Sequence, residues 1–247
     1  MHPTTVPIPW LNPGDAFPSP DRAWGPLDPA PGLLAAGGDL SPETLERAYR
    51  QGIFPWFSPG QPVLWWSPNP RMVLETARLK VHASLRKTLR HFRSTPGCEL
   101  HIDRDFGQVI RNCAQTPRQG QQGTWIVTEM IRAYENLHRR GLAHSVETWI
   151  DGELAGGLYC VSIGGMVYGE SMFTRRRDAS KIALAALVAL CRHNRIDLID
   201  CQQNTPHLAS LGAREMARTQ FQEQVRQRVD LPAAQWHFNT LYWSEVI

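Results

Sequence analysis

The chain has 247 residues, 42% of them hydrophobic, and a formal net charge of +3. This length and composition indicate an ordinary globular protein with one large domain or two modest ones. Because the net charge is small, attraction to nucleic acid would have to come from a local basic cluster.

The cysteines and the N-terminal sequence indicate the cellular compartment in which the protein works. The five cysteines include no C-x-x-C pair, which argues against a disulfide framework and against a zinc site. The N-terminus has no basic region followed by an apolar one, and the longest uncharged apolar run, Ile182 to Cys191, is too short to span a bilayer. We therefore expect a cytoplasmic protein that binds neither a metal nor a membrane.

The first part of the chain predicts an extended arm followed by a helix. Nine of the nineteen prolines precede residue 32, so the arm should run over the surface in extended and turn conformations. A helix begins at Pro42, after the N-cap candidate Ser41, and stops at Gly52. After an aromatic stretch, the alternation in R-M-V-L-E predicts a strand, and H-A-S-L-R-K-T-L-R-H-F-R predicts a short helix.

The remainder of the chain alternates between helix and strand patterns. Residues 129–140 predict a helix that ends at Gly141. Three β-rich runs follow, separated by turn dipeptides at 151–152 and 164–165, which predicts an antiparallel meander. An Ala/Leu-rich helix from Asp178 or Ala179 to about residue 194 precedes the buried strand I-D-L-I-D-C-Q. We expect the α/β (α+β) class, with a small N-terminal α+β domain over 1–76 and an α/β domain with a mixed sheet over 77–247.

One segment is strongly basic. Residues 77–97 contain six Lys and Arg residues and no acidic residue. Helical spacing places Arg86, Arg90 and Arg93 on one face, with Lys87 beside them. Such a stripe suits contact with the phosphates of nucleic acid. A solvated helix face explains the same charges equally well.

Four tryptophans crowd the first half of the chain. Trp56, Trp65, Trp66 and Trp125 each lie near glycine or proline, in segments that predict loops or loop ends. Tryptophans on loops line apolar pockets or stack on bases. The general burial of aromatic residues favours a core role for them instead.

The strand I-D-L-I-D-C-Q ends with side chains that can carry chemistry. Alternation sends Asp200 and Gln202 to one face and Cys201 to the other, so a cleft on the acidic face disfavours a cysteine nucleophile. Strand-end Asp and Gln residues also serve simply to cap backbone groups. His144 and His207 have no partner at metal-ligand spacing and are interpreted as structural histidines.

Several longer motifs, spread over residues 17–221, match one known family. They are G-L-L-A-A-G-G-D-L-S-P-E, Y-R-Q-G-I-F-P-W-F-S-P-G-Q-P-V-L-W-W-S-P-N-P-R, G-T-W-I, A-H-S-V-E-T-W, G-G-L-Y, G-E-S-M-F, A-S-K, L-I-D-C-Q and H-L-A-S-L-G-A-R-E. On these motifs the chain resembles the bacterial leucyl/phenylalanyl-tRNA–protein transferases. The resemblance implies a C-terminal domain similar to the acyl-CoA N-acyltransferase (GNAT-like) fold. CoA-dependent members of that fold bind pyrophosphate at a glycine-rich loop, whereas M-F-T-R-R-R-D-A-S here lacks glycine, which disfavours an acetyltransferase.

The resemblance also implies roles for individual residues. Asp200 and Gln202 occupy catalytic positions, and Glu170 contacts the amino group of the donor. The site for the aminoacyl-adenosine and its side chain would comprise Trp56, Trp125, Leu158, Glu170, Met172 and Phe173. The tRNA-binding patch would comprise Arg86, Lys87, Arg90 and Arg93. Two positions depart from the family pattern, with Ala83 in place of an arginine and Cys160 in place of a glycine.

The implied reaction transfers Leu or Phe, and less well Met, from aminoacyl-tRNA to the N-terminal amine of proteins that begin with Arg or Lys. This transfer tags those proteins for N-degron proteolysis, and the resemblance implies a monomeric enzyme without a cofactor. We expect Asp200 to accept the proton of the attacking amine and Gln202 to orient that amine. The alternatives are a CoA-dependent N-acetyltransferase, a non-catalytic tRNA-binding protein and a peptidoglycan-building transferase.

Overall fold

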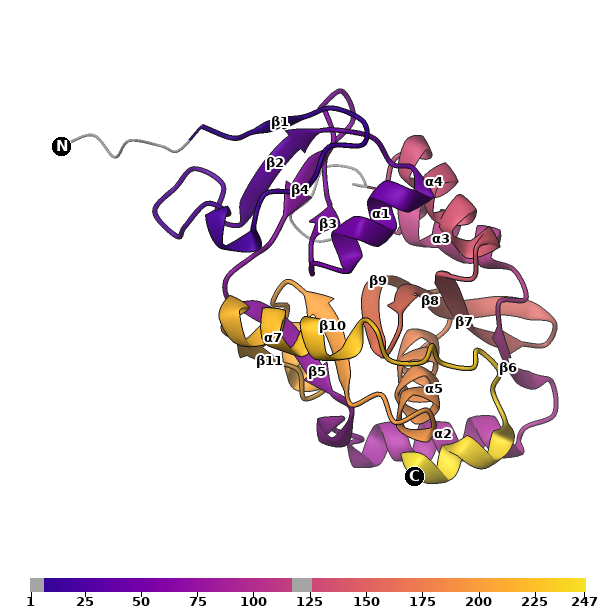
Figure 1. Ribbon diagram of the computed structural model, residues 1–247. Helices are drawn as coiled ribbons and strands as arrows, with labels where there is room; N and C mark the ends of the chain where they lie inside the picture. The colour runs from indigo at the N-terminus through magenta and orange to yellow at the C-terminus, as the bar shows by residue number, and fades with distance from the viewer. Residues whose placement is uncertain (1–6, 117–125) are drawn as a thin grey trace.

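The computed structural model describes residues 7–116 and 126–247, which form a large sheet and a smaller one (Figure 1). In sheet order, the strands of the smaller sheet are β1 (Trp10–Leu11), β2 (Leu33–Gly37), β4 (Leu64–Trp66) and β3 (Phe54–Pro55). The β1 and β2 strands are parallel, and the other neighbours are antiparallel. This sheet was not predicted, because its strands are only two to five residues long.

The proline-rich arm and the first helix follow the sequence prediction. The arm, as described from residue 7, contains extended chain, the β1 strand and a single 3-10 turn, η1 (Pro20–Arg22). The α1 helix (Pro42–Tyr49) begins where the Ser41 side chain accepts a hydrogen bond from the Thr44 N–H at 3.3 Å. The N-cap prediction is therefore confirmed.

The larger sheet is mixed, as predicted. In sheet order its strands are β11 (Arg214–Met216), β5 (Arg71–Glu75), β10 (Leu198–Gln202), β9 (Met166–Thr174), β8 (Glu153–Ile163), β7 (Ala143–Ile150) and β6 (Cys98–Ile102). The β9 and β10 strands are parallel, and all other neighbours are antiparallel. The predicted meander is confirmed as β7, β8 and β9.

The β5 strand bears on the domain boundary expected at residue 76. It lies before that boundary in the sequence, yet it pairs with β10 and β11 of the larger sheet. A strand that shares a ladder with two neighbours belongs to their folding unit. We therefore propose that the division between the two domains lies before Arg71.

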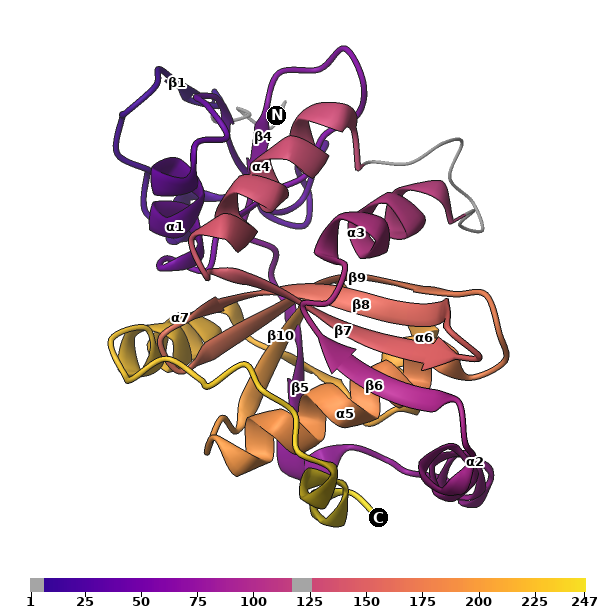
Figure 2. The same ribbon diagram turned by 90° about the vertical axis from the view of Figure 1, so that its right-hand side faces the viewer.

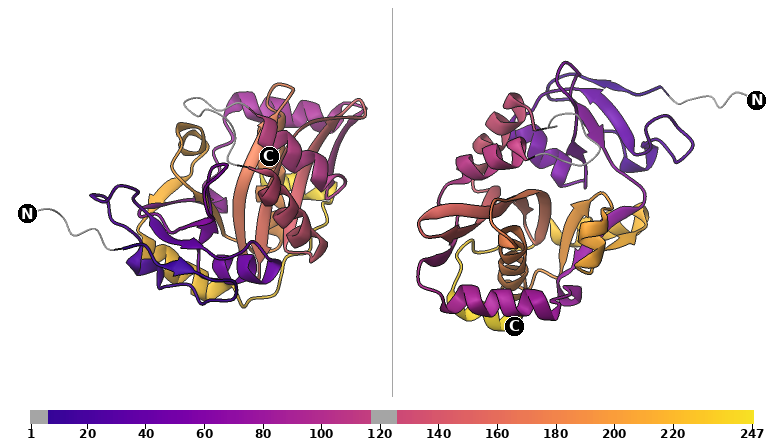
Figure 3. Two further views of the ribbon diagram at one scale, coloured as in Figure 1. Left: turned by 90° about the horizontal axis from the view of Figure 1, so that it is seen from above. Right: turned by 180° about the vertical axis from the view of Figure 1, so that it is seen from behind.

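Helices cover both faces of the larger sheet (Figure 2). One face carries α5 (Ala179–His193), α2 (Ala83–Ser94) and the C-terminal 3-10 turn η3 (Thr240–Glu245). The other face carries α1, α3 (Phe106–Gln115) and α4 (Thr128–Arg139). Figure 3 shows that the small sheet stands on the side of β5, β11 and α7 (Arg218–Arg228). The remaining short turns are η2 (Thr76–Arg78) and α6 (Pro206–Ser210).

The core consists of two clusters of buried residues, one on each face of the larger sheet. We call the cluster under α1, α3, α4 and the small sheet the upper cluster, and the one under α2 and α5 the lower cluster. The α5 helix is the predicted Ala/Leu-rich helix, and it is buried on almost every position from Ala179 to Cys191. Its small side chains let the helix approach the sheet closely.

Gly156 on β8 provides a test of this close approach. A Cβ atom added there would lie 2.6 Å from the Ala179 Cβ and 3.0 Å from the Ser180 nitrogen, so a side chain would push α5 away from the sheet. We predict that Gly156→Ala lowers the free energy of unfolding by about 1–3 kcal/mol in urea titrations. Gly25→Ala, whose Cβ would meet only an ordinary contact at 3.7 Å, should change it by less than about 0.5 kcal/mol. Equal values for the two variants would contradict the tight α5 contact.

Candidate active site

The parallel strands β9 and β10 stop pairing at Tyr168 and Asp200, just before Glu170 and Gln202. Their ladder joins Ile199 to Val167 and Asp200 to Tyr168. Beyond it, the pairing of β8 with β9 shifts register and leaves Glu170 as an extra residue, and β10 shifts between Asp200 and Gln202. Because a β-bulge redirects side chains, the side chains of Glu170 and Gln202 can meet beyond the end of the ladder.

Glu170 lies at the centre of a buried hydrogen-bonded group. Its Oε1 accepts hydrogen bonds from the Tyr49 hydroxyl at 2.7 Å and from the Gln202 amide at 2.9 Å, and its Oε2 accepts one from the Tyr134 hydroxyl at 3.1 Å. The two tyrosine hydroxyls are 2.5 Å apart. These four residues, the Glu170 cluster, come from α1, α4, β9 and β10, so one carboxyl group joins four elements.

Burial controls the protonation of the Glu170 cluster. Loss of solvation raises the pKa of Glu170 to about 7, although the hydrogen bonds from Tyr49 and Gln202 oppose that shift. Burial also raises the pKa of Tyr49 and of Tyr134 well above the usual tyrosine value, so both hydroxyls keep their protons. The carboxyl group can therefore gain or lose its charge near neutral pH while its tyrosine partners remain donors.

Asp200 is paired with an arginine that the sequence analysis did not identify. Arg71 donates from Nε to Oδ1 at 2.8 Å and from Nη2 to Oδ2 at 2.6 Å, and the two side chains are 1% and 0% exposed. Removing one partner of such a buried pair typically costs about 3–5 kcal/mol. Asp200 Oδ1 also accepts the backbone N–H of Gln202 at 2.8 Å. The predicted alternation holds, because Cys201 packs against the lower cluster.

The tryptophans divide between the core and the edge of the small sheet. Trp65 is fully buried and donates from Nε1 to the Gly37 carbonyl at 2.9 Å, in line with the core interpretation. Trp56 is half-buried, and its ring centroid lies 5.3 Å from that of Trp66. Trp125 lies outside the residues that the structure describes. The implied role of Trp56 in binding adenosine stays a prediction.

The residues expected to form the side-chain pocket fall on both faces of the sheet. Leu158 belongs to the lower cluster, and Met172, its cross-strand partner on β8 and β9, packs against the same cluster. Phe173 belongs to the upper cluster, which also contains Tyr49. The bulge at Glu170 interrupts the alternation, so Glu170 and Phe173 share a face although they are three positions apart. A single pocket wall that contains Phe173, Met172 and Leu158 stays a prediction.

The basic segment forms the exposed side of α2. Leu85, Leu89 and Phe92 are buried against the lower cluster, whereas the four predicted tRNA-binding side chains are exposed. A cavity of about 480 Å³ is lined by Val81, Ala83, Arg86, Lys87 and Arg90. Within residues 7–116 and 126–247, none of the four cations forms an ion pair with an acidic side chain. The α2 helix lies on the opposite face of the larger sheet from α1 and α4, which carry Tyr49 and Tyr134 (Figure 2).

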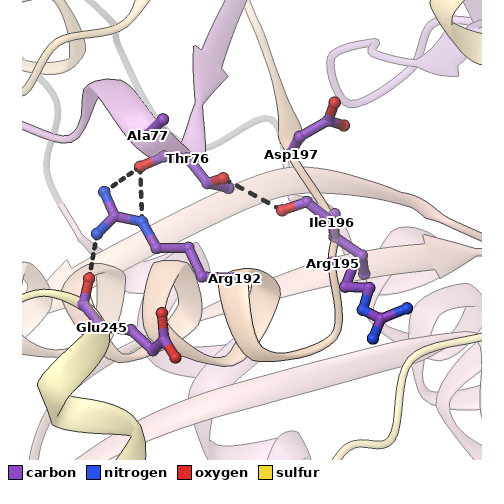
Figure 4. A pocket seen from close by; sticks show the side chains of 7 residues that line it. All are labelled: Thr76, Ala77, Arg192, Arg195, Ile196, Asp197 and Glu245. Carbon is purple, nitrogen blue, oxygen red and sulfur yellow. Dashed lines mark hydrogen bonds between the residues drawn. The ribbon is translucent and has the colours of Figure 1, made fainter.

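A cavity of about 370 Å³ lies beside the C-terminal end of α5 (Figure 4). Arg192 spans it and donates hydrogen bonds to the backbone carbonyls of Thr76 and Glu245. None of the side chains predicted to act in catalysis or binding lines this cavity. The Arg192 side chain therefore connects α5 to η2 and η3, which indicates a structural role for this cavity.

One group of side chains has a composition typical of metal sites. Asp103, His138 and His144 hold their ligand atoms within 4.8 Å of one another. His144 contacts Asp103 Oδ2 at 2.6 Å and the Gly141 carbonyl at 3.0 Å, and His138 contacts the Ala143 carbonyl at 2.8 Å. These nitrogens already have hydrogen-bond partners, which fits the structural interpretation of His144. All five cysteines are free thiols.

Comparison with known proteins gives matches over most of the chain. The family described as "Leucyl/phenylalanyl-tRNA protein transferase" matches residues 73–226, and its N-terminal domain matches residues 38–69. The "Leucyl/phenylalanyl-tRNA--protein transferase" of Polaromonas sp. is 58% identical over 98% of this chain and 94% of its own length. The protein of the same name from Leptothrix cholodnii is 59% identical over 97% of this chain and 95% of its own length.

Similarity to solved structures is weaker. The structure titled "GCN5-related N-acetyltransferase from Kribbella flavida" has a TM-score of 0.36 and 13% identity, and it covers 61% of this chain and 55% of its own. None of the described helices is long and apolar enough to cross a membrane.

The whole-length matches establish that the chain is an aminoacyltransferase, an enzyme class whose substrates include aminoacyl-tRNA and a protein acceptor. It belongs to the leucyl/phenylalanyl-tRNA protein transferase family.

Glu170 makes the pH dependence of stability testable. The pKa of Glu170 is about 7 in the folded state and 4.5 in its ordinary, solvated state, so between these pH values the folded state binds more protons than the unfolded state. The stability of the folded state therefore falls as pH rises from about 4.5 to about 7. We predict that Glu170→Gln, measured by urea unfolding, gains up to about 3 kcal/mol relative to the parent over that range. Glu223→Gln should change the profile in the opposite direction, because Arg226 lowers the pKa of that exposed carboxyl group. Parallel profiles for Glu170→Gln and the parent would contradict the shift.

Proposed function

We propose that this enzyme transfers Leu or Phe, and less well Met, from aminoacyl-tRNA to the N-terminal amine of proteins that begin with Arg or Lys. Transfer marks these proteins for N-degron proteolysis in the cytoplasm, and the enzyme works as a monomer without a cofactor. Family membership supports the donor and the acceptor classes. The structural observation that carries the proposal is the buried Glu170 carboxyl group, bonded to the Gln202 amide at 2.9 Å.

The Glu170 carboxyl group suits the free amine of an aminoacyl ester. An ammonium group that enters the cluster brings a positive charge, and an opposite charge close by favours the ionised form of a carboxyl group. With its pKa raised to about 7, Glu170 is only partly ionised near neutral pH, and a bound ammonium group would favour its charged form. The hydroxyls of Tyr49 and Tyr134 hold the carboxylate in place at 2.7 and 3.1 Å. This agrees with the contact to the donor amine that the family resemblance implies for Glu170.

The transfer itself is aminolysis of an ester: the amine forms an amide bond with the aminoacyl carbonyl carbon, the ester bond to the tRNA ribose breaks, and the ribose oxygen leaves with the proton that the amine loses. The enzyme must therefore chiefly align the attacking amine with the carbonyl carbon. Such orientation contributes about 7–11 kcal/mol to catalysis. Gln202 suits this task, because its side chain is buried, its amide donates to Glu170 and its backbone N–H donates to Asp200. Asp200 and Gln202 remain the proposed catalytic pair, with Gln202 as the group that meets the amine.

Donor selection would rely on an apolar surface beside the Glu170 cluster. Phe173 is 2% exposed and lies on the same face as Glu170, and Trp56 is half-buried at the edge of the small sheet. An apolar wall of this kind distinguishes side chains that differ by one methyl group by only about 1–3 kcal/mol. Transfer of Met at a reduced rate follows from that small difference.

The exposed face of α2 would bind the tRNA phosphates. Arg86, Lys87 and Arg90 line one cavity and have no acidic partner among residues 7–116 and 126–247. Their charges are therefore available to phosphate groups, and binding should weaken as the salt concentration rises. Ala83 lines the same cavity in place of the family's arginine, which removes one phosphate contact.

Turnover variants test the catalytic assignment. We predict that Asp200→Asn and Gln202→Ala each lower the rate of labelled Leu transfer from Leu-tRNA to a peptide beginning with Arg by about tenfold or more. The affinity for Leu-tRNA, measured by filter binding, should stay near that of the parent. Parental turnover in both variants would refute the pair, and no transfer by the parent enzyme would refute the proposed function.

Charge reversal tests the tRNA patch. Arg86→Glu with Arg90→Glu should raise the Michaelis constant for Leu-tRNA about tenfold or more, because phosphate contacts dominate nucleic-acid affinity. The constant for a minimal aminoacyl-adenosine donor should change little. Arg226→Glu on α7 is a control at another exposed arginine, 67% exposed at its side chain. Equal losses with both donors, or an equal loss in the control, would count against the patch.

A further inference from the structure

Arg71 has the features of a residue that acts on the reaction through others. It is the first residue of β5, and its side chain is 1% exposed although it carries a permanent positive charge. It donates one hydrogen bond to each carboxylate oxygen of Asp200, from Nε at 2.8 Å and from Nη2 at 2.6 Å. This bidentate geometry fixes the plane of the carboxylate as well as its position.

Two aromatic rings pack against the guanidinium group of Arg71. The Phe54 ring centroid lies 4.7 Å from the Arg71 Cζ atom, and the Phe221 ring centroid lies 4.6 Å from it. Aromatic faces attract a cation at these distances. Phe54 comes from β3 of the small sheet and Phe221 from α7, so three separate parts of the chain determine where Asp200 lies.

Asp200 passes this constraint on to Gln202. Its Oδ1 accepts the Gln202 N–H at 2.8 Å, and Gln202 has a φ of 61°, in the left-handed region that a residue with a side chain rarely adopts. An aspartate that bonds the backbone two residues on stabilises such a turn. The turn directs the Gln202 amide toward Glu170, which it reaches at 2.9 Å.

We infer that Arg71 is a positioning residue of the transfer reaction, which fixes Asp200 and, through it, the Gln202 amide beside Glu170. The inference rests on the proposed function for its reaction. Both oxygens of Asp200 are engaged by Arg71, so Asp200 serves as a fixed charge behind Gln202 and leaves direct contact with the amine to Gln202. The sequence-based assignment of Asp200 as the proton acceptor gives way, in this inference, to an indirect role.

Arg71→Lys tests the inference, because lysine keeps the charge but cannot form the two-pronged contact. Its control is Val188→Ala, a fully buried position of α5 in the lower cluster, which loses stability without touching the pair. Both full-length variants are assayed well below their melting temperatures with Leu-tRNA and a peptide beginning with Arg. We expect kcat to fall about tenfold or more in Arg71→Lys and the Michaelis constant for Leu-tRNA to stay within about twofold. The control should keep the parental kcat.

A second measurement does not depend on activity. In ¹⁵N-labelled enzyme, the side-chain amide signals of Gln202, assigned through Gln202→Ala, should shift in Arg71→Lys and stay unchanged in Val188→Ala. Parental kcat in Arg71→Lys, or Gln202 signals that do not move, would overturn the positioning role. Shifted signals in an enzyme whose parent form transfers nothing would instead overturn the proposed function and retain the link from Arg71 to Gln202.

Discussion

Asp200 carries its charge at a place that water does not reach, and the surrounding structure is arranged to compensate for that charge. A buried carboxylate is tolerated when a cation and hydrogen-bond donors satisfy it. Arg71 supplies the cation, and its guanidinium carbon lies 4.7 Å from the Phe54 ring centroid and 4.6 Å from the Phe221 ring centroid. The small sheet, the larger sheet and α7 therefore meet at one ion pair, and the geometry of Gln202 depends on it through the bond from its N–H to Asp200.

Two carboxyl groups on the same face of the sheet are stabilised in different ways. Asp200 has a permanent cation, whereas Glu170 has neutral donors in Tyr49, Tyr134 and Gln202. Neutral donors hold a carboxyl group in position without cancelling its negative charge. That charge therefore stays available to a positively charged group of a substrate. This difference suits the two proposed roles, in which Asp200 would hold Gln202 in position and Glu170 would bind the amine of the substrate.

Much of the fold followed from sequence periodicity. The α1, α2, α4 and α5 helices, the meander and the β5 and β10 strands were predicted, because each has a clear repeat or a clear stop residue. The small sheet was not, because its short strands lie among prolines. For the site, alternation gave the shared face of Asp200 and Gln202. Arg71 was missed because its partner lies 129 residues away, and a lone arginine before an apolar strand gives no local signal.

The contacts of α7 have a consequence for synthesis on the ribosome. Phe221 and Gln222 pack against the turn at Gly52, and Gln222 donates a hydrogen bond to the Gln51 carbonyl at 2.9 Å. The N-terminal quarter of the chain is thus contacted by residues made near the end of translation, and these contacts can form only after the intervening chain exists. A nascent chain arrested before α7 emerges would lack the Phe221 ring beside the Arg71 guanidinium, so premature termination would release a polypeptide whose Arg71–Asp200 pair has lost one of its aromatic neighbours.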